Sequence, residues 1–122
     1  YRFNVAVVGQ CDPQAAGTWF SGKTYVNGSP QSGNKVVFSG AGPDGEWATQ
    51  PVISGPHAGY EGWDQGYYSH IISSNGAVAG TWHVWIVDDA GARISEIASW
   101  SSSGVVAEFT GCNQQVIDFD SR

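Results

Sequence analysis

Apolar and polar residues alternate with a period of two in several short stretches of this chain, which is typical of β-strands with one buried face. The first such stretch, YRFNVAVVG, opens the chain. Its alternating apolar positions are Tyr1, Phe3, Val5 and Val7. We therefore expect a strand-like N-terminal arm over residues 1–10. A single β-sandwich domain is expected to follow over residues 11–122, beginning with the turn-rich link DPQAAG.

Strand-like runs recur through the rest of the chain, and segments rich in glycine, asparagine or proline separate them. The expected strands are 18–26, 35–39, 47–54, 67–73, 80–89, 92–100 and 114–119, with a further short strand at 105–109. The pair Asn27-Gly28 predicts a hairpin between the first two, because both residues tolerate a positive φ. A tight turn at Ala90-Gly91 is expected to join 80–89 to 92–100. No stretch shows a helical period, so the pattern predicts an antiparallel, immunoglobulin-like β-sandwich of about seven strands plus the arm.

The composition agrees with this fold class and excludes some functions. Apolar residues make up 41% of the 122 residues, charged residues only 13%, and there are 17 glycines. This length suffices for one domain with its own core. The net charge is −6, and the five lysines and arginines are scattered, which argues against nucleic acid as a main partner. No apolar run is long enough to cross a bilayer, so we expect no membrane insertion.

One stretch resembles a known family of extracellular modules. The segment GTWFSGKTYVNGSPQSGNKVVFS, with its Asn-Gly-x-Pro turn and the later Gly33, resembles the first hairpin of bacterial carboxypeptidase-regulatory-like domains. The runs GTWHVWIVDDAGARISE and QVIDF are similar to modules of secreted and cell-surface bacterial proteins. The resemblance covers residues 17–120 and implies a transthyretin-like β-sandwich, and it carries no catalytic residue to this chain. The loop 40–66 is longer and more aromatic than in the simplest members.

The only cysteines, Cys11 and Cys112, each flank an expected end strand. They are either two thiols of a cytosolic protein or a disulfide. The chain lacks methionine, including at its first position, and we expect either a removed leader or a module of a longer protein. These features favour a disulfide and an extracellular or cell-surface location. For such a loop of about 100 residues, the chain-entropy estimate of the stabilisation is ~4.7 kcal/mol.

No sequence motif points to catalysis or to metal binding. Neither Gly-x-Ser-x-Gly nor Cys-x-x-Cys occurs, and His57, His70 and His83 are isolated, which favours ordinary core or surface histidines. Asp118 and Asp120 share one strand face and could offer oxygen ligands to calcium, but nothing has the spacing of a calcium-binding loop. We therefore interpret them as solvated or turn-capping residues, and we expect no enzyme activity and no cofactor.

Aromatic residues give the strongest functional signal, with six tryptophans and five tyrosines. On 80–89, Trp85 lies on the face opposite Trp82, so one tryptophan is exposed unless something covers it. A subunit interface, a platform that stacks on sugar rings, and simple core filling all fit such residues. The candidates for the first two roles are Tyr60, Trp63, Trp47 and Trp85. Asn27 also fits the N-glycosylation pattern, although Pro30 disfavours modification and a turn is the simpler interpretation.

Together these features predict a non-enzymatic extracellular structural module that assembles head-to-tail with copies of itself into a filament. The arm would donate its strand to the sheet of a neighbouring copy, as in donor-strand pairing. The open alternative is that the arm is simply the first strand of its own sandwich. The alternative function is a carbohydrate-binding module of a secreted multidomain protein, with polysaccharide as the partner.

Overall fold

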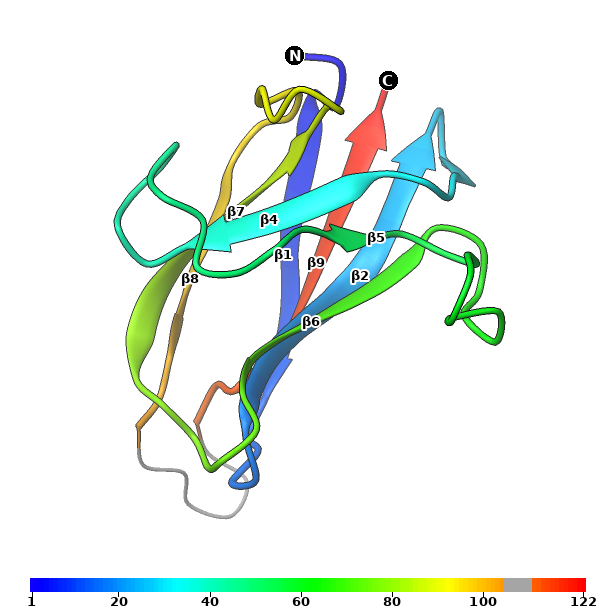
Figure 1. Ribbon diagram of the computed structural model, residues 1–122. Helices are drawn as coiled ribbons and strands as arrows, with labels where there is room; N and C mark the ends of the chain where they lie inside the picture. Colours follow the sequence, from blue (N-terminus) through cyan, green and yellow to red (C-terminus); the bar gives the residue numbers. More distant parts are fainter. Residues whose placement is uncertain (105–110) are drawn as a thin grey trace.

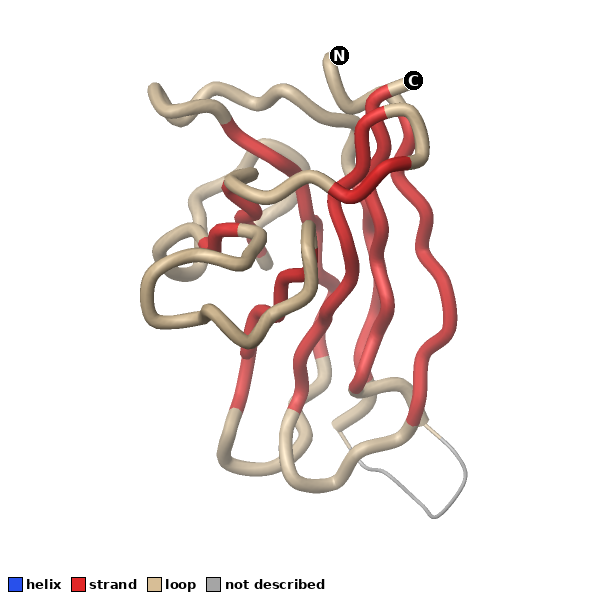
Figure 2. The backbone as a smooth tube through the Cα atoms, turned by 90° about the vertical axis from the view of Figure 1, so that its right-hand side faces the viewer, coloured by secondary structure: helices blue, strands red, loops and turns tan. Residues whose placement is uncertain are grey.

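The chain folds as a two-sheet β-sandwich (Figures 1 and 2). The computed structural model describes residues 1–104 and 111–122, and these contain no helix. The strands are β1 Val5–Asp12, β2 Thr18–Val26, β3 Ser29–Pro30, β4 Lys35–Ser39, β5 Val52–Ile53, β6 Tyr67–Ser73, β7 Gly80–Val87, β8 Ala98–Ser102 and β9 Gln114–Ser121. The expected all-β sandwich is therefore confirmed. The short strand expected at 105–109 lies outside the described residues.

The first sheet has the order β1–β9–β2, and β2 pairs on its other side with β6 and, near its end, with β3. Strand β9 is antiparallel to β1 and parallel to β2, whereas β6 is antiparallel to β2. The second sheet has the order β5–β4–β7–β8 and is antiparallel throughout. The core between the sheets is built from Phe3, Phe20, Val36, Phe38, Tyr68, Val84, Ile86, Ala98, Trp100, Ile117 and Phe119.

The expected hairpin between 18–26 and 35–39 is only half right. Asn27 and Gly28 do form a tight turn, with φ angles of 49° and 79°. The strand that returns along β2 is only the two-residue β3, and β4 crosses to the second sheet, where it lies between β5 and β7. This crossing follows from burial, because β4 buries consecutive residues on both of its faces and needs cover on both sides.

The expected strand 92–100 also forms only in part. Regular pairing with β7 is confined to β8, and the segment before it makes a single isolated bridge between Val87 and Arg93. In this segment the N–H of Ile94 still donates to the oxygen of Ile86 in β7 at 2.9 Å. Other backbone groups bond to the N-terminus instead: the N–H of Phe3 donates to the oxygen of Ile94, and the N–H of Glu96 donates to the oxygen of Phe3, both at 2.9 Å. Phe3 thus pairs with backbone groups of this segment that do not bond to β7.

The predicted disulfide is present. Cys11 lies in β1 and Cys112 lies just before β9, with a Cα–Cα distance of 5.2 Å. The two strands are neighbours in the first sheet, and Cys11 pairs in register with Gln115. The bond therefore fastens the end of β1 to the start of β9.

Candidate functional site

The N-terminal arm is a strand of its own sandwich. Residues 5–8 pair with β9 in antiparallel register, placing Val5 opposite Asp120 and Val7 opposite Asp118. Of the two arrangements left open by the sequence, the structure has the intramolecular one. In the described part of the chain β1 pairs only with β9, so its other backbone edge faces outward.

The expectation of one apolar face along the arm is wrong. Phe3 is fully buried in the core, whereas Val7 is 51% exposed on the outer surface and Ala6 packs against the core instead. The reason is a change of sheet at Asn4. Residue 3 bonds to the segment that follows β7, and residues 5–12 run along β9. The Asn4 side chain holds the backbone at this change of sheet. Its amide N–H donates to the backbone oxygen of Arg122, and its amide oxygen accepts from the backbone N–H of Arg122, both at 2.9 Å.

The tip of the arm is held at the surface by Arg93. Its guanidinium carbon lies 4.0 Å from the centre of the Tyr1 ring, and the group also donates to the Tyr1 hydroxyl. A second donation, from Arg93 Nε to Asp44 at 2.7 Å, fixes the orientation of the guanidinium. Cation–π contacts at exposed sites contribute roughly 0.5–1 kcal/mol, so this contact is a weak latch on the arm.

The arm joins the disulfide through a break in strand pairing. The β1–β9 register shifts between Val8 and Cys11, so Gly9 and Gln10 lie outside the regular ladder. The Gln115 side chain bridges the break by donating to the oxygens of Gly9 and Gln10 at 2.8 and 3.1 Å. Gly9 and Gln10 therefore form a bulge within β1, between residues 1–8 and the disulfide, and we call this bulge the joint of the arm. Residues 1–8 are on the far side of this joint from the disulfide.

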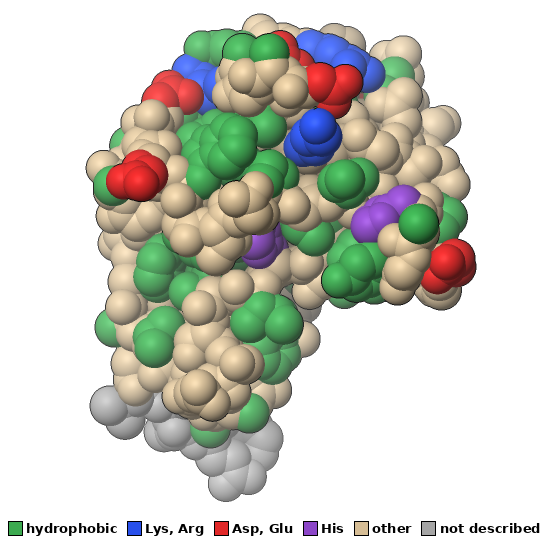
Figure 3. Space-filling model, viewed as in Figure 1, with side chains coloured by type: hydrophobic (Ala, Val, Ile, Leu, Met, Phe, Trp, Pro, Cys, Tyr) green, Lys and Arg blue, Asp and Glu red, His purple; other side chains and the backbone are tan. Residues whose placement is uncertain are grey.

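A second candidate surface lies on the loop between β5 and β6. We call His57, Tyr60 and Trp63 the aromatic shelf. The Tyr60 ring lies 4.5 Å from that of Trp63 and 5.0 Å from that of His57, measured between centroids. Figure 3 shows the loop as a lobe on which a histidine and hydrophobic side chains gather. Tyr60 is 49% exposed, and Trp63 packs partly against the core. The structure thus brings two of the sequence candidates together.

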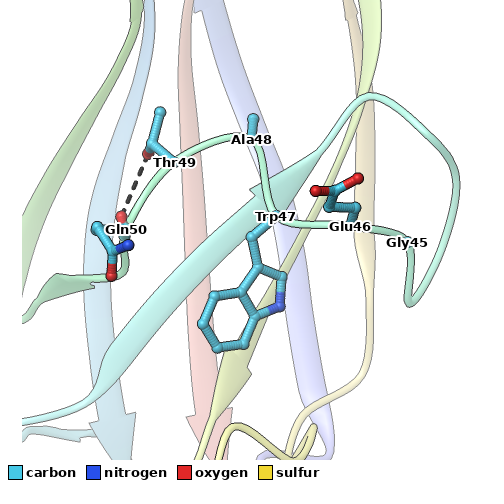
Figure 4. A pocket seen from close by; sticks show the side chains of 6 residues that line it. All are labelled: Gly45, Glu46, Trp47, Ala48, Thr49 and Gln50. Atoms are coloured by element: carbon cyan, nitrogen blue, oxygen red, sulfur yellow. Dashed lines mark hydrogen bonds between the residues drawn. The ribbon is translucent and has the colours of Figure 1, made fainter.

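The other two aromatic candidates lie elsewhere. Trp85 is buried on the outer face of the second sheet, with Val37 and Val87 beside it. Trp47 packs over this cluster, and Figure 4 shows its indole extending from the segment 45–50 across the sheet. The expectation that Trp85 forms an exposed platform is therefore wrong, because the loop after β4 covers this side chain. The sequence did not show what covers Trp85, since Trp47 lies 38 positions before it in the chain.

Two histidines have clear structural settings. His83 lies within 2.7 Å of the Ser99 hydroxyl on the neighbouring strand. His70 is only 8% exposed and lies against the rings of Phe20 and Phe38. Burial penalises the imidazolium and lowers the pKa of His70 to about 4. Its Nε2 atom has no hydrogen-bond partner among the described residues.

The paired carboxylates serve the fold. Asp118 accepts from the N–H of Lys23 at 2.8 Å, and Asp120 accepts from Arg122 Nε at 2.9 Å. Within the described residues, no group of three His, Cys, Asp or Glu side chains is placed to hold a metal. Asn27 is exposed at its turn, and its glycosylation stays a prediction.

No family model, curated protein or solved structure matches this chain. The resemblance to carboxypeptidase-regulatory-like modules therefore stays a prediction. The part of the chain that the structure describes has no helix that could cross a membrane.

Proposed function

We propose that this chain is a non-enzymatic, extracellular structural module that assembles head-to-tail with copies of itself by exchanging its N-terminal arm. The observation that carries the proposal is the attachment of the arm. It is an edge strand whose pairing breaks at Gly9 and Gln10, immediately before the disulfide at Cys11. In the exchanged form, residues 1–8 of one copy leave their own β9 and take the same place on the β9 of the next copy.

Exchange of this kind changes few contacts, which makes it thermodynamically accessible. Phe3 re-enters an identical core pocket, and the backbone pairs of residues 5–8 re-form on an identical strand. The free-energy difference between the closed and the exchanged form is then set mainly by the joint and by protein concentration, as in other domain swaps. Each copy gives its arm to one neighbour and receives an arm from another. Such a head-to-tail contact grows into a filament when the rotation between copies does not close a ring.

The disulfide gives the exchanged arm a covalent anchor. Cys11 stays bonded to Cys112 of its own domain while residues 1–8 lie in the neighbour. Tension along the filament then passes from the arm into β9 through a covalent bond. The disulfide also supports the extracellular assignment, because such bonds persist in oxidising compartments.

A locked arm provides the test. Val7 and Asp118 lie opposite each other in the β1–β9 register, so cysteines at both positions are placed to bond within one chain. The oxidised double variant Val7→Cys, Asp118→Cys should stay monomeric in sedimentation and negative-stain microscopy. Wild type and both single variants should form high-mass species under the same conditions. Assembly of the locked variant at the wild-type level, or a wild type that is monomeric at every concentration, would refute the proposal.

A further inference from the structure

The aromatic shelf borders a groove on the side of the sandwich where the two sheets open. This groove runs between β5, at the edge of the second sheet, and β6, at the edge of the first. The residues that line it are Gln50, Pro51, Val52, Ile53, His57, Tyr60, Ser69, His70 and Ile71. We propose that the groove and shelf bind a neutral polysaccharide, with a sugar ring stacked on Tyr60. This site is separate from the arm and does not depend on arm exchange.

The Tyr60 ring is held in place before any ligand arrives. The N–H of Tyr60 donates to the oxygen of His57 at 2.8 Å, and the N–H of Trp63 donates to the oxygen of Tyr60 at 3.2 Å. Trp63 in turn packs edge-on against Tyr67, with 5.2 Å between ring centroids. The base of the loop is closed by the N–H of Gly66, which donates to the oxygen of Gly55 at 2.6 Å. A ligand that stacks on this ring therefore orders little that is not already ordered.

The chemistry of the groove selects an uncharged ligand with both apolar and hydroxyl-bearing surfaces. Exposed apolar area comes from Tyr60 and from Ile71, which is 58% exposed. Hydrogen-bonding groups come from the amide of Gln50 and the hydroxyl of Ser69, and no lysine, arginine, aspartate or glutamate lines the groove. A neutral pyranose has this combination, because its C–H face stacks on an aromatic ring while its hydroxyls point outward to polar side chains.

His70 adds a buried polar group beside the groove. It lines the groove, is more than nine-tenths buried, and has an Nε2 atom without a hydrogen-bond partner among the described residues. Buried polar atoms are normally paired, so the unpaired Nε2 is available to a ligand hydroxyl that reaches it. Its lowered pKa keeps the imidazole neutral near pH 7, which suits a hydroxyl and disfavours an anion.

The test is affinity electrophoresis of the full chain in native gels that contain a neutral glucan: mixed-linkage β-glucan, xyloglucan or glucomannan. At least one of these should retard the wild type, while gels with alginate, an anionic polysaccharide, should not. Tyr60→Phe keeps the ring and should be retarded within about threefold of wild type. Tyr60→Leu keeps apolar area but loses the ring and should bind on the order of tenfold more weakly.

Two results would overturn the proposal. The first is a wild type that none of the three neutral glucans retards. The second is equal retardation of Tyr60→Phe and Tyr60→Leu, since stacking would then have no part in binding. If the first result is found and Tyr60→Leu also loses self-assembly, the shelf is instead a contact between copies. The arm-locked variant should bind glucan like the wild type, so failure of the arm-exchange proposal is seen separately.

Discussion

Alanine substitutions at Phe3 and at Val7 distinguish the path of the arm in the structure from the path that its sequence pattern predicts. In the pattern the two residues are equivalent, because both lie on the expected apolar face. In the structure Phe3 is fully buried in the core between the sheets, and Val7 is half-exposed on the outer surface. Alanine at each position therefore tests whether the arm changes sheets at Asn4.

The expected costs differ severalfold. Phenylalanine-to-alanine changes in protein cores cost roughly 3–5 kcal/mol, as the sum of lost transfer free energy and the cavity that remains. Phe3 has no exposed area, so Phe3→Ala should fall in this range. Val7→Ala removes two methyl groups from a side chain that keeps about half its area in water, and it should cost about 0.5 kcal/mol. A difference of ~3 kcal/mol corresponds to roughly 10 °C in Tm for a domain of this size.

Urea unfolding followed by tryptophan fluorescence measures the two costs, at concentrations where the chain is monomeric. The midpoint of Phe3→Ala should fall well below that of the wild type, and the midpoint of Val7→Ala should stay close to it. Similar slopes are needed for the midpoints to be compared directly. Equal losses for the two variants would refute the change of sheet at Asn4 and restore the single apolar face.

Three further predictions concern the body of the domain. His70 has a folded pKa of about 4 against 6.5 unfolded, so the unfolded state takes up the proton first and stability falls as the pH drops from about 6.5 towards 4. His70→Phe should reduce this fall by about 2 kcal/mol in urea unfolding at pH 7 and 4.5, and an unchanged pH dependence would contradict the assignment. Gly22→Ala places its Cβ 1.7 Å from the backbone oxygen of Ile117 and should cost several kcal/mol, whereas Gly62→Ala meets no atom within 4 Å and should be nearly neutral. Replacing both disulfide cysteines by serine should lower the unfolding free energy by about 2–5 kcal/mol, and an unchanged midpoint would show that the bond adds no stability.

Local patterns predicted local structure well. The bounds of Thr18–Val26 and Tyr67–Ser73 agree with the structure, because each run is rich in aromatic and β-branched residues and turn residues border it. The turn at Asn27 was equally clear, since few residues tolerate a positive φ. The disulfide followed from there being only two cysteines beside end strands.

The features of the fold that the sequence did not predict depend on long-range contacts. The path of the arm depends on Asn4, whose partner Arg122 lies 118 positions away. The sheet that β4 joins depends on which strands already flank β2, which no local pattern records. The candidate site likewise has a local part that the sequence predicted and a long-range part that it did not. Tyr60 and Trp63 are neighbours in one loop, but their groove needs β5 and β6 from different sheets to lie side by side.

A mixing experiment tests arm exchange most directly. Protein with Val7→Cys is combined with protein with Asp118→Cys under conditions of assembly, then mildly oxidised, and the native disulfide is checked by peptide mapping. Arm exchange predicts a covalent pair joining one chain of each variant, because Val7 of one copy faces Asp118 of the next in the β1–β9 register. High-mass species that contain no such mixed disulfide would contradict arm exchange.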